Sequence, residues 1–188
     1  MKLANIEDIK KGCLLLSEPF MFDPNFKRSV VLLTEYNEDG VVGFILNKPM
    51  SLTIDEAMID FPEFKSPLFY GGPVETQTMH FVHKIGLRLE GSQKITEKIY
   101  WGGDFDQLKE MITNREVSLN DIKFFVGYSG WGFEQLHEEF NTNSWIVANA
   151  STESVFSTDE EKLWKQILKN KGDVFASLAN YPEHPWLN

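Results

Sequence analysis

The chain has 188 residues and a formal charge of −10, because 28 acidic residues outweigh 18 basic ones. Hydrophobic residues make up 42% of the sequence, which is enough for one sizeable core and excludes a disordered chain. A charge of this sign repels phosphate backbones and anionic lipids, so direct nucleic-acid contact and binding to a membrane surface are both disfavoured. Cys13 is the single cysteine, so no intrachain disulfide exists.

The ends of the chain bear on compartment and domain organisation. Glu7 and Asp8 stand where a signal peptide would have its apolar stretch, and no apolar run is long enough to span a bilayer. We therefore expect a soluble cytoplasmic protein. With no repeat and no obvious linker, residues 1–188 should form a single domain with its core at about 10–170 and a C-terminal tail at 171–188. The last residues of that tail, 181–188, form either a loose end or a docked peptide.

The first part of the chain predicts a short helical lead-in over 1–11, a buried strand at 12–17 and an irregular loop with two prolines at 18–25. Two β-rich runs follow, at 29–34 and 41–46. The segment between them ends in an Asp-Gly pair that is typical of hairpin turns. We expect an antiparallel hairpin here.

The middle of the chain predicts two helices with short strands between them. Thr53 and Glu56 have the spacing of a capping box, so a short helix should begin here and end before Pro62. Asp104 is the expected N-cap of a second helix, whose apolar stripe extends to Ile112. Strands are expected in three segments: 68–70, 78–82 and 97–101.

The last third begins with a β-branched and aromatic run at 122–126. It enters a segment with three glycines in six residues, 127–132, and a helical pattern follows at 133–140. This order predicts a strand, a tight glycine turn and a helix. A further strand is expected at 144–148, and a last helix capped from 157–158. Short strands with helices inserted between them predict a single α+β domain.

Two histidines, His80 and His83, are a first candidate for metal chemistry. Residues three apart on a strand point to opposite faces, so these two cannot share a metal ion if the segment is a strand. On a helix they could, but no third ligand lies nearby and the His-Glu-x-x-His motif is absent. We therefore predict no metal site.

Ser129 lies in a setting close to the nucleophile elbow of hydrolases. The Gly-x-Ser-x-Gly spacing fails, because Trp131 occupies the last position and Gly130 comes one residue early. The favoured interpretation is that Ser129 serves a turn or caps the following helix. His137 lies at the border of that helix's apolar stripe, which favours a packed, hydrogen-bonded role over a catalytic one.

Glycine turns before a helix can bind anions through free N–H groups. Here Glu134, Glu138 and Glu139 follow, and they would repel phosphate. The helix pattern places these glutamates opposite the apolar stripe. A second glycine pair, Gly71-Gly72, lacks the residues of a phosphate loop and predicts only a sharp reversal. We expect Trp131 to pack against that reversal.

Several motifs, taken together and in order, resemble the YqgE/AlgH family of small bacterial proteins that also occurs in plants. They span about residues 10–157: Gly12-Cys-Leu-Leu-Leu-Ser17 with Pro19, Phe26-Lys-Arg-Ser-Val-Val-Leu-Leu33, Gly43-Phe-Ile-Leu-Asn-Lys-Pro49, Tyr70-Gly-Gly-Pro-Val74 with His83, and Gly127-Tyr-Ser-Gly-Trp131 through Gln135-Leu136 to Trp145. The sequence departs from the family pattern at Lys48, where arginine is usual, and at Phe133-Glu134, where Pro-Gly is frequent.

The resemblance implies an α+β fold with a bent, mostly antiparallel and partly barrel-like sheet flanked by helices. It also implies a transcriptional-regulator label, taken from a member linked to control of alginate production. It brings no catalytic residue and no cofactor. The label fits poorly with an acidic chain that has no helix-turn-helix signature, so regulation is expected to act through a protein partner or a small ligand.

Three hypotheses about function follow. The first is a cytosolic binding protein of unknown biochemical activity whose site lies near the glycines and Trp131. The second is a small hydrolase that uses His83 or His137 with nearby carboxylates, and the third is direct DNA binding. The binding residues expected under the first hypothesis are Asn47, Gly71, Gly72, Pro73, His83, Gly127, Tyr128, Gly130, Trp131 and Gln135. The sequence does not indicate the oligomeric state.

Overall fold

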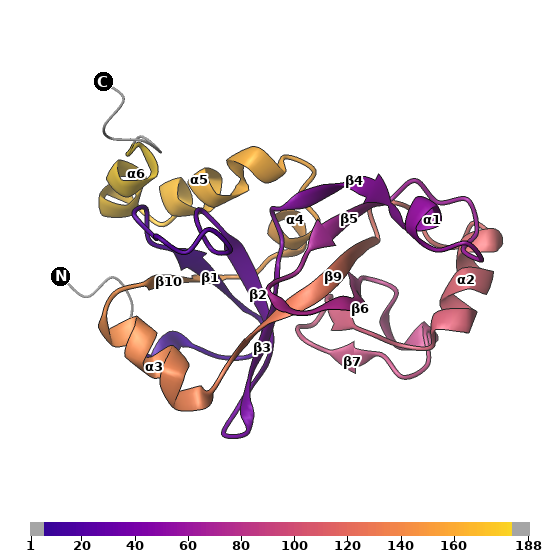
Figure 1. Cartoon of the computed structure of the whole chain (residues 1–188), viewed down its shortest axis with the longest axis horizontal. Coiled ribbons are helices and arrows are strands. Elements are labelled where there is room, and N and C mark those ends of the chain that lie inside the picture. The colour runs from indigo at the N-terminus through magenta and orange to yellow at the C-terminus, as the bar shows by residue number, and fades with distance from the viewer. Residues whose placement is uncertain (1–5, 182–188) are drawn as a thin grey trace.

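The computed structural model describes residues 6–181 and shows a single-domain α+β fold around one large sheet (Figure 1). The strands are β1 Cys13–Ser17, β2 Val30–Asn37, β3 Gly40–Ile45, β4 Pro49–Thr53, β5 Pro67–Tyr70, β6 Val74–His83, β7 Gln93–Lys94, β8 Tyr100–Trp101, β9 Ile122–Trp131 and β10 Trp145–Asn149. They pair in the order β10-β1-β2-β3-β9-β6-β8-β7, and β5, which carries β4, also pairs with β9. Within the described residues, every pairing is antiparallel except that of β5 with β9. The sheet is not closed into a barrel, because β10 and β7 end its pairing order.

The helices connect the strands and cover the sheet. They are the 3-10 turns η1 Ile6–Asp8 and η2 Gly86–Arg88, and the helices α1 Ile54–Ala57, α2 Phe105–Thr113, α3 Phe133–Asn141, α4 Thr152–Val155, α5 Glu160–Asn170 and α6 Asp173–Ala179. No helix within residues 6–181 has the length and apolar character needed to cross a membrane.

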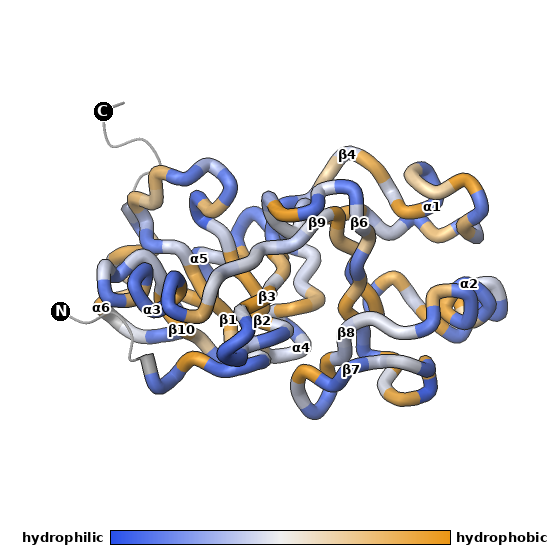
Figure 2. Tube along the Cα trace, turned by 60° about the horizontal axis from the view of Figure 1, so that its bottom comes forward, coloured by the Kyte–Doolittle hydropathy of each residue, from blue (hydrophilic) through white to orange (hydrophobic). Residues whose placement is uncertain are grey.

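The helices lie around three buried clusters. The first lies between the sheet and α5, where Leu163, Trp164 and Leu168 pack on residues from β1, β2 and β3. The second lies at the other end of the molecule, between α1, α2 and strands β5, β6 and β9 (Figure 1). The third lies beneath α3 and includes Leu136 and Phe140. In Figure 2 the hydrophobic stretches gather in the middle of the sheet near β1, β2 and β3, as a core enclosed from both sides requires.

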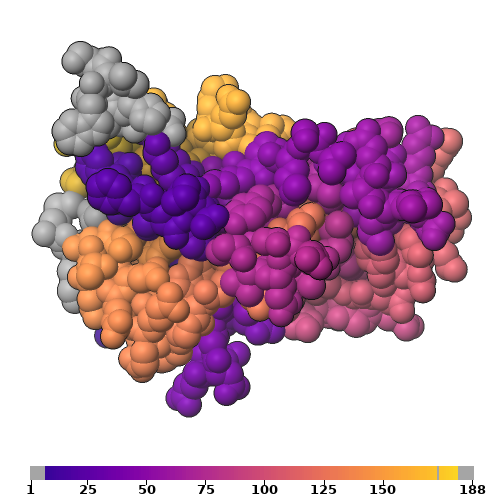
Figure 3. Space-filling view, in the orientation of Figure 1, coloured from indigo at the N-terminus to yellow at the C-terminus, as the bar shows by residue number. Residues whose placement is uncertain are grey.

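The predicted hairpin is confirmed as β2 and β3, which pair antiparallel from Val31 opposite Ile45 to Asn37 opposite Gly40. Its tip projects from the body of the molecule at the bottom of Figure 3, and residues 37–39 are exposed. The second predicted helix is also confirmed as α2, whose N-cap Asp104 accepts a hydrogen bond from the Gln107 N–H at 2.7 Å. Both elements have strong local signals, namely an Asp-Gly turn and an Asp cap before an apolar stripe.

The first predicted helix is shorter than expected. It ends at Ala57 after one turn, because Met58 adopts an extended backbone. Phe61, which the predicted helix would have included, reaches the core from the following loop, where its ring lies 5.7 Å from that of Phe124. Phe61 is therefore buried as a helix would have buried it, but the packing of a loop places it there.

The C-terminal part adds structure that the sequence analysis did not expect. Residues 173–179, in the segment set apart as a tail, form α6, and Phe175 and Leu178 pack on the first cluster. The last long helix, α5, has its N-cap at Asp159, not at the predicted 157–158. The prediction for the final residues falls mainly on 182–188, which lie outside the described part.

The predicted strand, glycine turn and helix at 122–140 is wrong in its middle. Strand β9 continues through Gly127 and Gly130 to Trp131, and only Gly132 lies between it and α3. The amino-terminal half of β9 pairs with β5 on one edge and β6 on the other, and its last residues pair with β3. Strand β9 therefore joins the two halves of the sheet.

Candidate functional site

Five predicted site residues come together where the chain crosses β9. The same part of β9 pairs with both β5 and β6, so these strands lie on its opposite edges and the segment from Gly71 to Pro73 must cross from one to the other. It crosses directly over Gly127 and Tyr128, and a Cβ on Gly72 would collide with the Tyr128 carbonyl group. A Cβ on Gly127 would lie 2.7 Å from the Gly72 oxygen. The glycines are needed because backbone packs on backbone.

The protein's own groups fill the crossing. The Gly71 N–H donates to the Val126 oxygen at 2.9 Å. The Gly71 oxygen accepts hydrogen bonds from the Ile45 N–H and from the Ser129 hydroxyl, both at 3.0 Å. The expected turn or cap role for the Ser129 hydroxyl is wrong, because Ser129 lies within β9 and its hydroxyl bonds to Gly71, while α3 has its N-cap at Gly132. Ser129 also has no exposed surface, so a substrate could not reach it. Pro73 is exposed beside the crossing.

Trp131 lies in the third cluster and not against the Gly71-Gly72 reversal, so that prediction is wrong. Its ring is 5.7 Å from that of Trp145 and 5.6 Å from that of Phe26. Its indole N–H donates to Glu139 Oε2 at 3.1 Å, and the Trp145 indole donates to the same oxygen at 2.7 Å. Glu139 therefore faces inward, although the helix pattern placed it opposite the apolar stripe.

Two further predicted site residues lie near Trp131. Gln135 accepts a hydrogen bond from the Gly132 N–H at 3.3 Å and donates to Glu139 at 3.1 Å, so it helps to start α3. Gly130 is an exposed position of β9 opposite Val42. Neither residue lines the cleft described below.

Asn47 lies at the end of β3 and holds the start of β2. Its side-chain oxygen accepts from the Val30 N–H at 2.8 Å, and its amide donates to the Arg28 oxygen at 2.9 Å. The amide group therefore replaces a strand partner where the ladder ends. This use of both its donor and its acceptor explains an asparagine here without a ligand.

His83 is fully buried at the end of β6. Its Nδ1 accepts from the Ile85 N–H at 3.2 Å, so its Nε2 carries the proton and donates to the Gly102 oxygen at 2.9 Å. Burial lowers the pKa of His83, although the Gly102 carbonyl opposes this effect. A neutral His83 thus fixes the main chain at Gly102.

The fixed Gly102 main chain is one wall of a cleft of about 430 Å³ beside β6 and β8, which sequence reasoning missed. The lining side chains are mainly aromatic or sulfur-containing, with three glycines that expose main chain: Met58, Met79, His80, Phe81, Gly91, Gln93, Trp101, Gly102, Gly103 and Phe105. None of the predicted binding residues lines it, apart from Gly102 being held by one of them. His83 contributes only indirectly, through its hydrogen bond to the Gly102 oxygen. The Trp101-Gly102-Gly103 sequence was a usable signal, because an aromatic residue before two glycines combines a ring with accessible backbone.

The other histidines have ordinary partners. His80 lies on β6, 2.9 Å from the Thr78 hydroxyl, and His137 lies 2.8 Å from the Tyr36 hydroxyl. Within residues 6–181, no three His, Cys, Asp or Glu side chains gather in a group that could hold a metal ion.

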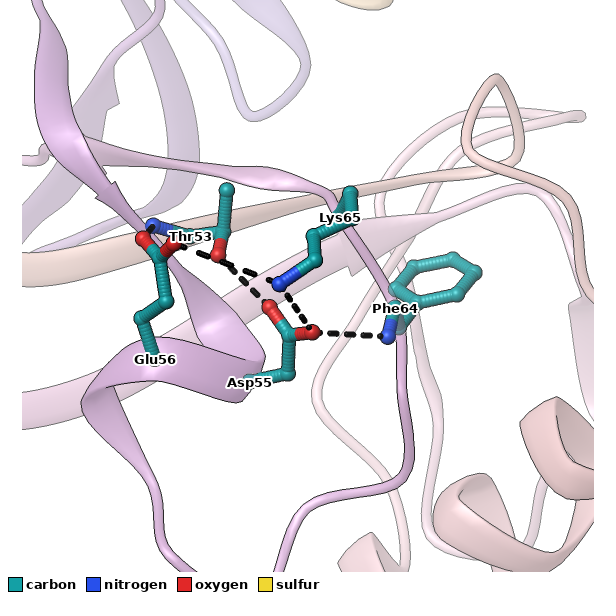
Figure 4. A network of polar contacts seen from close by, with 5 residues as sticks. All are labelled: Thr53, Asp55, Glu56, Phe64 and Lys65. Atoms are coloured by element: carbon teal, nitrogen blue, oxygen red, sulfur yellow. Dashed lines mark hydrogen bonds and ion pairs between the residues drawn. The ribbon is translucent and has the colours of Figure 1, made fainter.

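A polar network ties α1 to the loop that follows it (Figure 4). Asp55 accepts hydrogen bonds from the Thr53 hydroxyl at 2.6 Å and from the Phe64 N–H at 3.3 Å, and Lys65 lies 3.0 Å from it. Chiefly through the Thr53 hydrogen bond, the pKa of Asp55 falls to about 2. Glu56 accepts from the Thr53 N–H at 3.0 Å, which is half of the predicted capping box. Each of these polar groups has a partner within the network, so we assign the network a role in stabilising the fold.

Comparison with known proteins identifies relatives along nearly the whole chain. A family model described as DUF179, AlgH-like, matches residues 14–176. A UPF0301 protein of Chlorobium limicola is 42% identical over 182 residues, covering 97% of each chain. A UPF0301 protein of Cytophaga hutchinsonii is 41% identical and covers 96% of this chain and 100% of its own. These names state no activity.

Two solved structures share the fold. The crystal structure of a protein from Corynebacterium diphtheriae superposes with a TM-score of 0.77 at 20% identity, covering 92% of this chain and 93% of its own. The solution structure of the AlgH protein from Pseudomonas aeruginosa gives a TM-score of 0.71 at 24% identity, covering 92% of this chain and 94% of its own. At these identities the likeness concerns the fold alone.

Proposed function

Because the chain belongs to the AlgH-like family, DUF179, whose relatives have no stated activity, we propose a function from its own cleft. The protein binds a small, uncharged, planar aromatic molecule in the cleft beside β8. Any regulatory role then acts through this ligand or through a protein partner, not through direct DNA contact. The observation that carries the proposal is the lining of the cleft, which combines aromatic walls with exposed main chain.

The walls of the cleft suit a flat ring. Phe81 and Phe105 lie with their ring centroids 6.0 Å apart, and the His80 and Trp101 rings lie 6.4 Å apart. Aromatic side chains bind planar ligands through stacked or edge-on contacts of their π-systems. Methionines from two different elements, Met58 and Met79, add polarisable surface that adapts to ligand shape.

The polarity of the cleft selects an uncharged ligand. Among the described residues that line it, none has a permanently charged side chain. Burial lowers the pKa of His80, so its imidazole is neutral at pH 7. Gln93 and the glycine main chain supply hydrogen-bonding groups, which would fix a heterocycle with both donors and acceptors. The volume lies within the range of small-molecule sites.

The test uses indole and adenine as neutral probes, benzoate as an anionic probe, and amide chemical shifts of the labelled protein as the readout. We expect indole or adenine, but not benzoate, to shift Gly102, Gly103 and their neighbours. Trp101→Ala removes one wall and should weaken binding about tenfold, as expected for the loss of one stacking partner.

Leu87→Ala is the matched control, because Leu87 is 76% exposed and does not line the cleft. It should leave probe affinity unchanged. If Trp101→Ala lowers stability, Met79→Ala gives a smaller change in the same wall and should still reduce affinity. Shifts that fall elsewhere, or that are the same in wild type and both cleft variants, would refute the proposed site.

A further inference from the structure

A lysine side chain lies buried in the middle of β9. Lys123 stands between Ile122 and Phe124 and is only 5% exposed, although strand neighbours of this kind are normally apolar. Its Nζ lies 4.1 Å from the centroid of the Phe69 ring. Burying an ammonium group is unfavourable unless all of its N–H groups are paired.

The partners of Nζ fit an uncharged amine. Nζ donates to the Leu46 oxygen at 3.1 Å and to the Ser157 oxygen at 3.2 Å. These two acceptors satisfy both N–H groups of a neutral amine and leave its lone pair free. The third N–H of an ammonium group would have the face of the Phe69 ring and the Glu160 carboxylate, whose oxygen lies 3.9 Å away, so it lacks an oxygen acceptor within hydrogen-bonding distance.

The surroundings also shift the protonation equilibrium. Burial lowers the pKa of Lys123 to about 8, although the negative charge of Glu160 opposes the shift. At pH 7 roughly one molecule in ten then carries a neutral amine, against roughly one in three thousand for an ordinary lysine. Phe156, which lines the cleft described next, also contacts Lys84, whose Nζ lies 5.0 Å from its ring centroid and forms an ion pair with Asp121.

A cleft of about 200 Å³ reaches this lysine from the surface between β5, β9 and the segment before α5. Lys123 and Glu160 line it together with the rings of Phe69 and Phe156 and with polar side chains such as Asn120. It is separate from the aromatic cleft beside β8, with which it shares no lining residue. Its volume admits a molecule of a few heavy atoms.

We propose that Lys123 is a nucleophilic amine that condenses with a small aldehyde or ketone in this cleft. The Nζ lone pair forms a bond to the carbonyl carbon, and the C=O π electrons move to oxygen. A proton passes from nitrogen to that oxygen, with Glu160 placed to relay it, and gives a carbinolamine. Loss of water then leaves an imine, so the aldehyde or ketone and the amine become imine and water without any oxidant or reductant.

The proposal is tested on the intact wild-type protein with propanal and sodium cyanoborohydride, which reduces an imine to a stable propylamine. Peptide mass spectrometry after chymotrypsin digestion reports the labelling rate at each lysine. At pH 7 we expect Lys123 to be labelled about tenfold faster than Lys84, because burial lowers the pKa of the Lys123 amine and the cleft holds the aldehyde beside it. Lys84 is the matched comparison, since it lies near the same cleft and its side chain is 32% exposed.

Two further measurements distinguish a reactive amine from a buried structural clamp. The Lys123 rate should rise with pH and reach half of its maximum near pH 8, while labelling in denaturant should remove its advantage over Lys84. A Lys123→Gln variant should lose the fast site and keep the Lys84 rate. If Lys84 reacts first and Lys123 stays unlabelled in the folded protein, Lys123 only ties β3 and residue 157 to β9, and the proposal is wrong.

Discussion

At the scale of single residues, Glu139 shows how one carboxylate organises a core. Both indole groups that donate to it, those of Trp131 and Trp145, belong to buried residues. An indole N–H can only donate, and leaving it unpaired inside a protein is unfavourable. The glutamate therefore lets two tryptophans pack at 5.7 Å beneath α3 without an unsatisfied donor.

Replacing Glu139 with alanine should lower the free energy of unfolding by about 2–3 kcal/mol, because two buried donors lose a charged acceptor. Urea unfolding followed by tryptophan fluorescence measures this. Glu138→Ala is the control, since Glu138 is exposed on the same helix and should change stability by less than about 0.5 kcal/mol. Equal effects of the two variants would mean that the indole contacts contribute nothing measurable.

At the scale of elements, β9 is the strand on which both halves of the sheet depend. The main chain at 71–73 crosses directly over it, so close approach at Gly72 and Gly127 fixes the geometry of the crossing. Both glycines also have positive φ angles, +151° and +68°. A side chain here would be strained and would also collide with backbone that cannot move independently.

Gly72→Ala should therefore destabilise the protein by more than about 3 kcal/mol or prevent folding. Gly132→Ala is the control at a glycine outside the crossing, because its Cβ would approach nothing closer than Gln135 at 3.9 Å. It should lower stability by no more than about 1 kcal/mol, as a weaker N-cap. Thermal unfolding of both variants measures the difference in stability. A Gly72→Ala protein as stable as Gly132→Ala would show that the crossing is not tight.

The same elements show what the sequence could predict. The hairpin at β2 and β3 and helix α2 each depend on neighbours within about ten residues, and both were predicted. The role of Gly127 depends on Gly72, which is distant in the chain, so the local pattern indicated a turn where a strand continues. The aromatic cleft combines residues from Met58 to Phe105 on separate elements, and no single segment carries its signal.

At the scale of the whole molecule, proton binding couples charge to stability. Burial lowers the pKa values of His80 and His83 below their ordinary 6.5. The network of Figure 4 lowers the pKa of Asp55 from 3.8 to about 2. In each case the unfolded chain takes up its proton at a higher pH than the folded protein does. Acidification therefore favours unfolding in two separate windows.

The first window opens as the pH falls below about 6.5, where the unfolded chain binds protons at His80 and His83 before the folded protein does. The second spans about pH 3.8 to 2, where the contribution of Asp55 is lost. Urea unfolding at a series of pH values should show stability decreasing through both windows. His83→Gln should make the decrease in the first window smaller, because only His80 then titrates there, and Asp55→Asn should flatten the second. A wild-type stability that stays constant from pH 7 to 5 would contradict the lowered pKa values of His80 and His83, and with them the neutral His83 that donates to the Gly102 oxygen in the wall of the aromatic cleft.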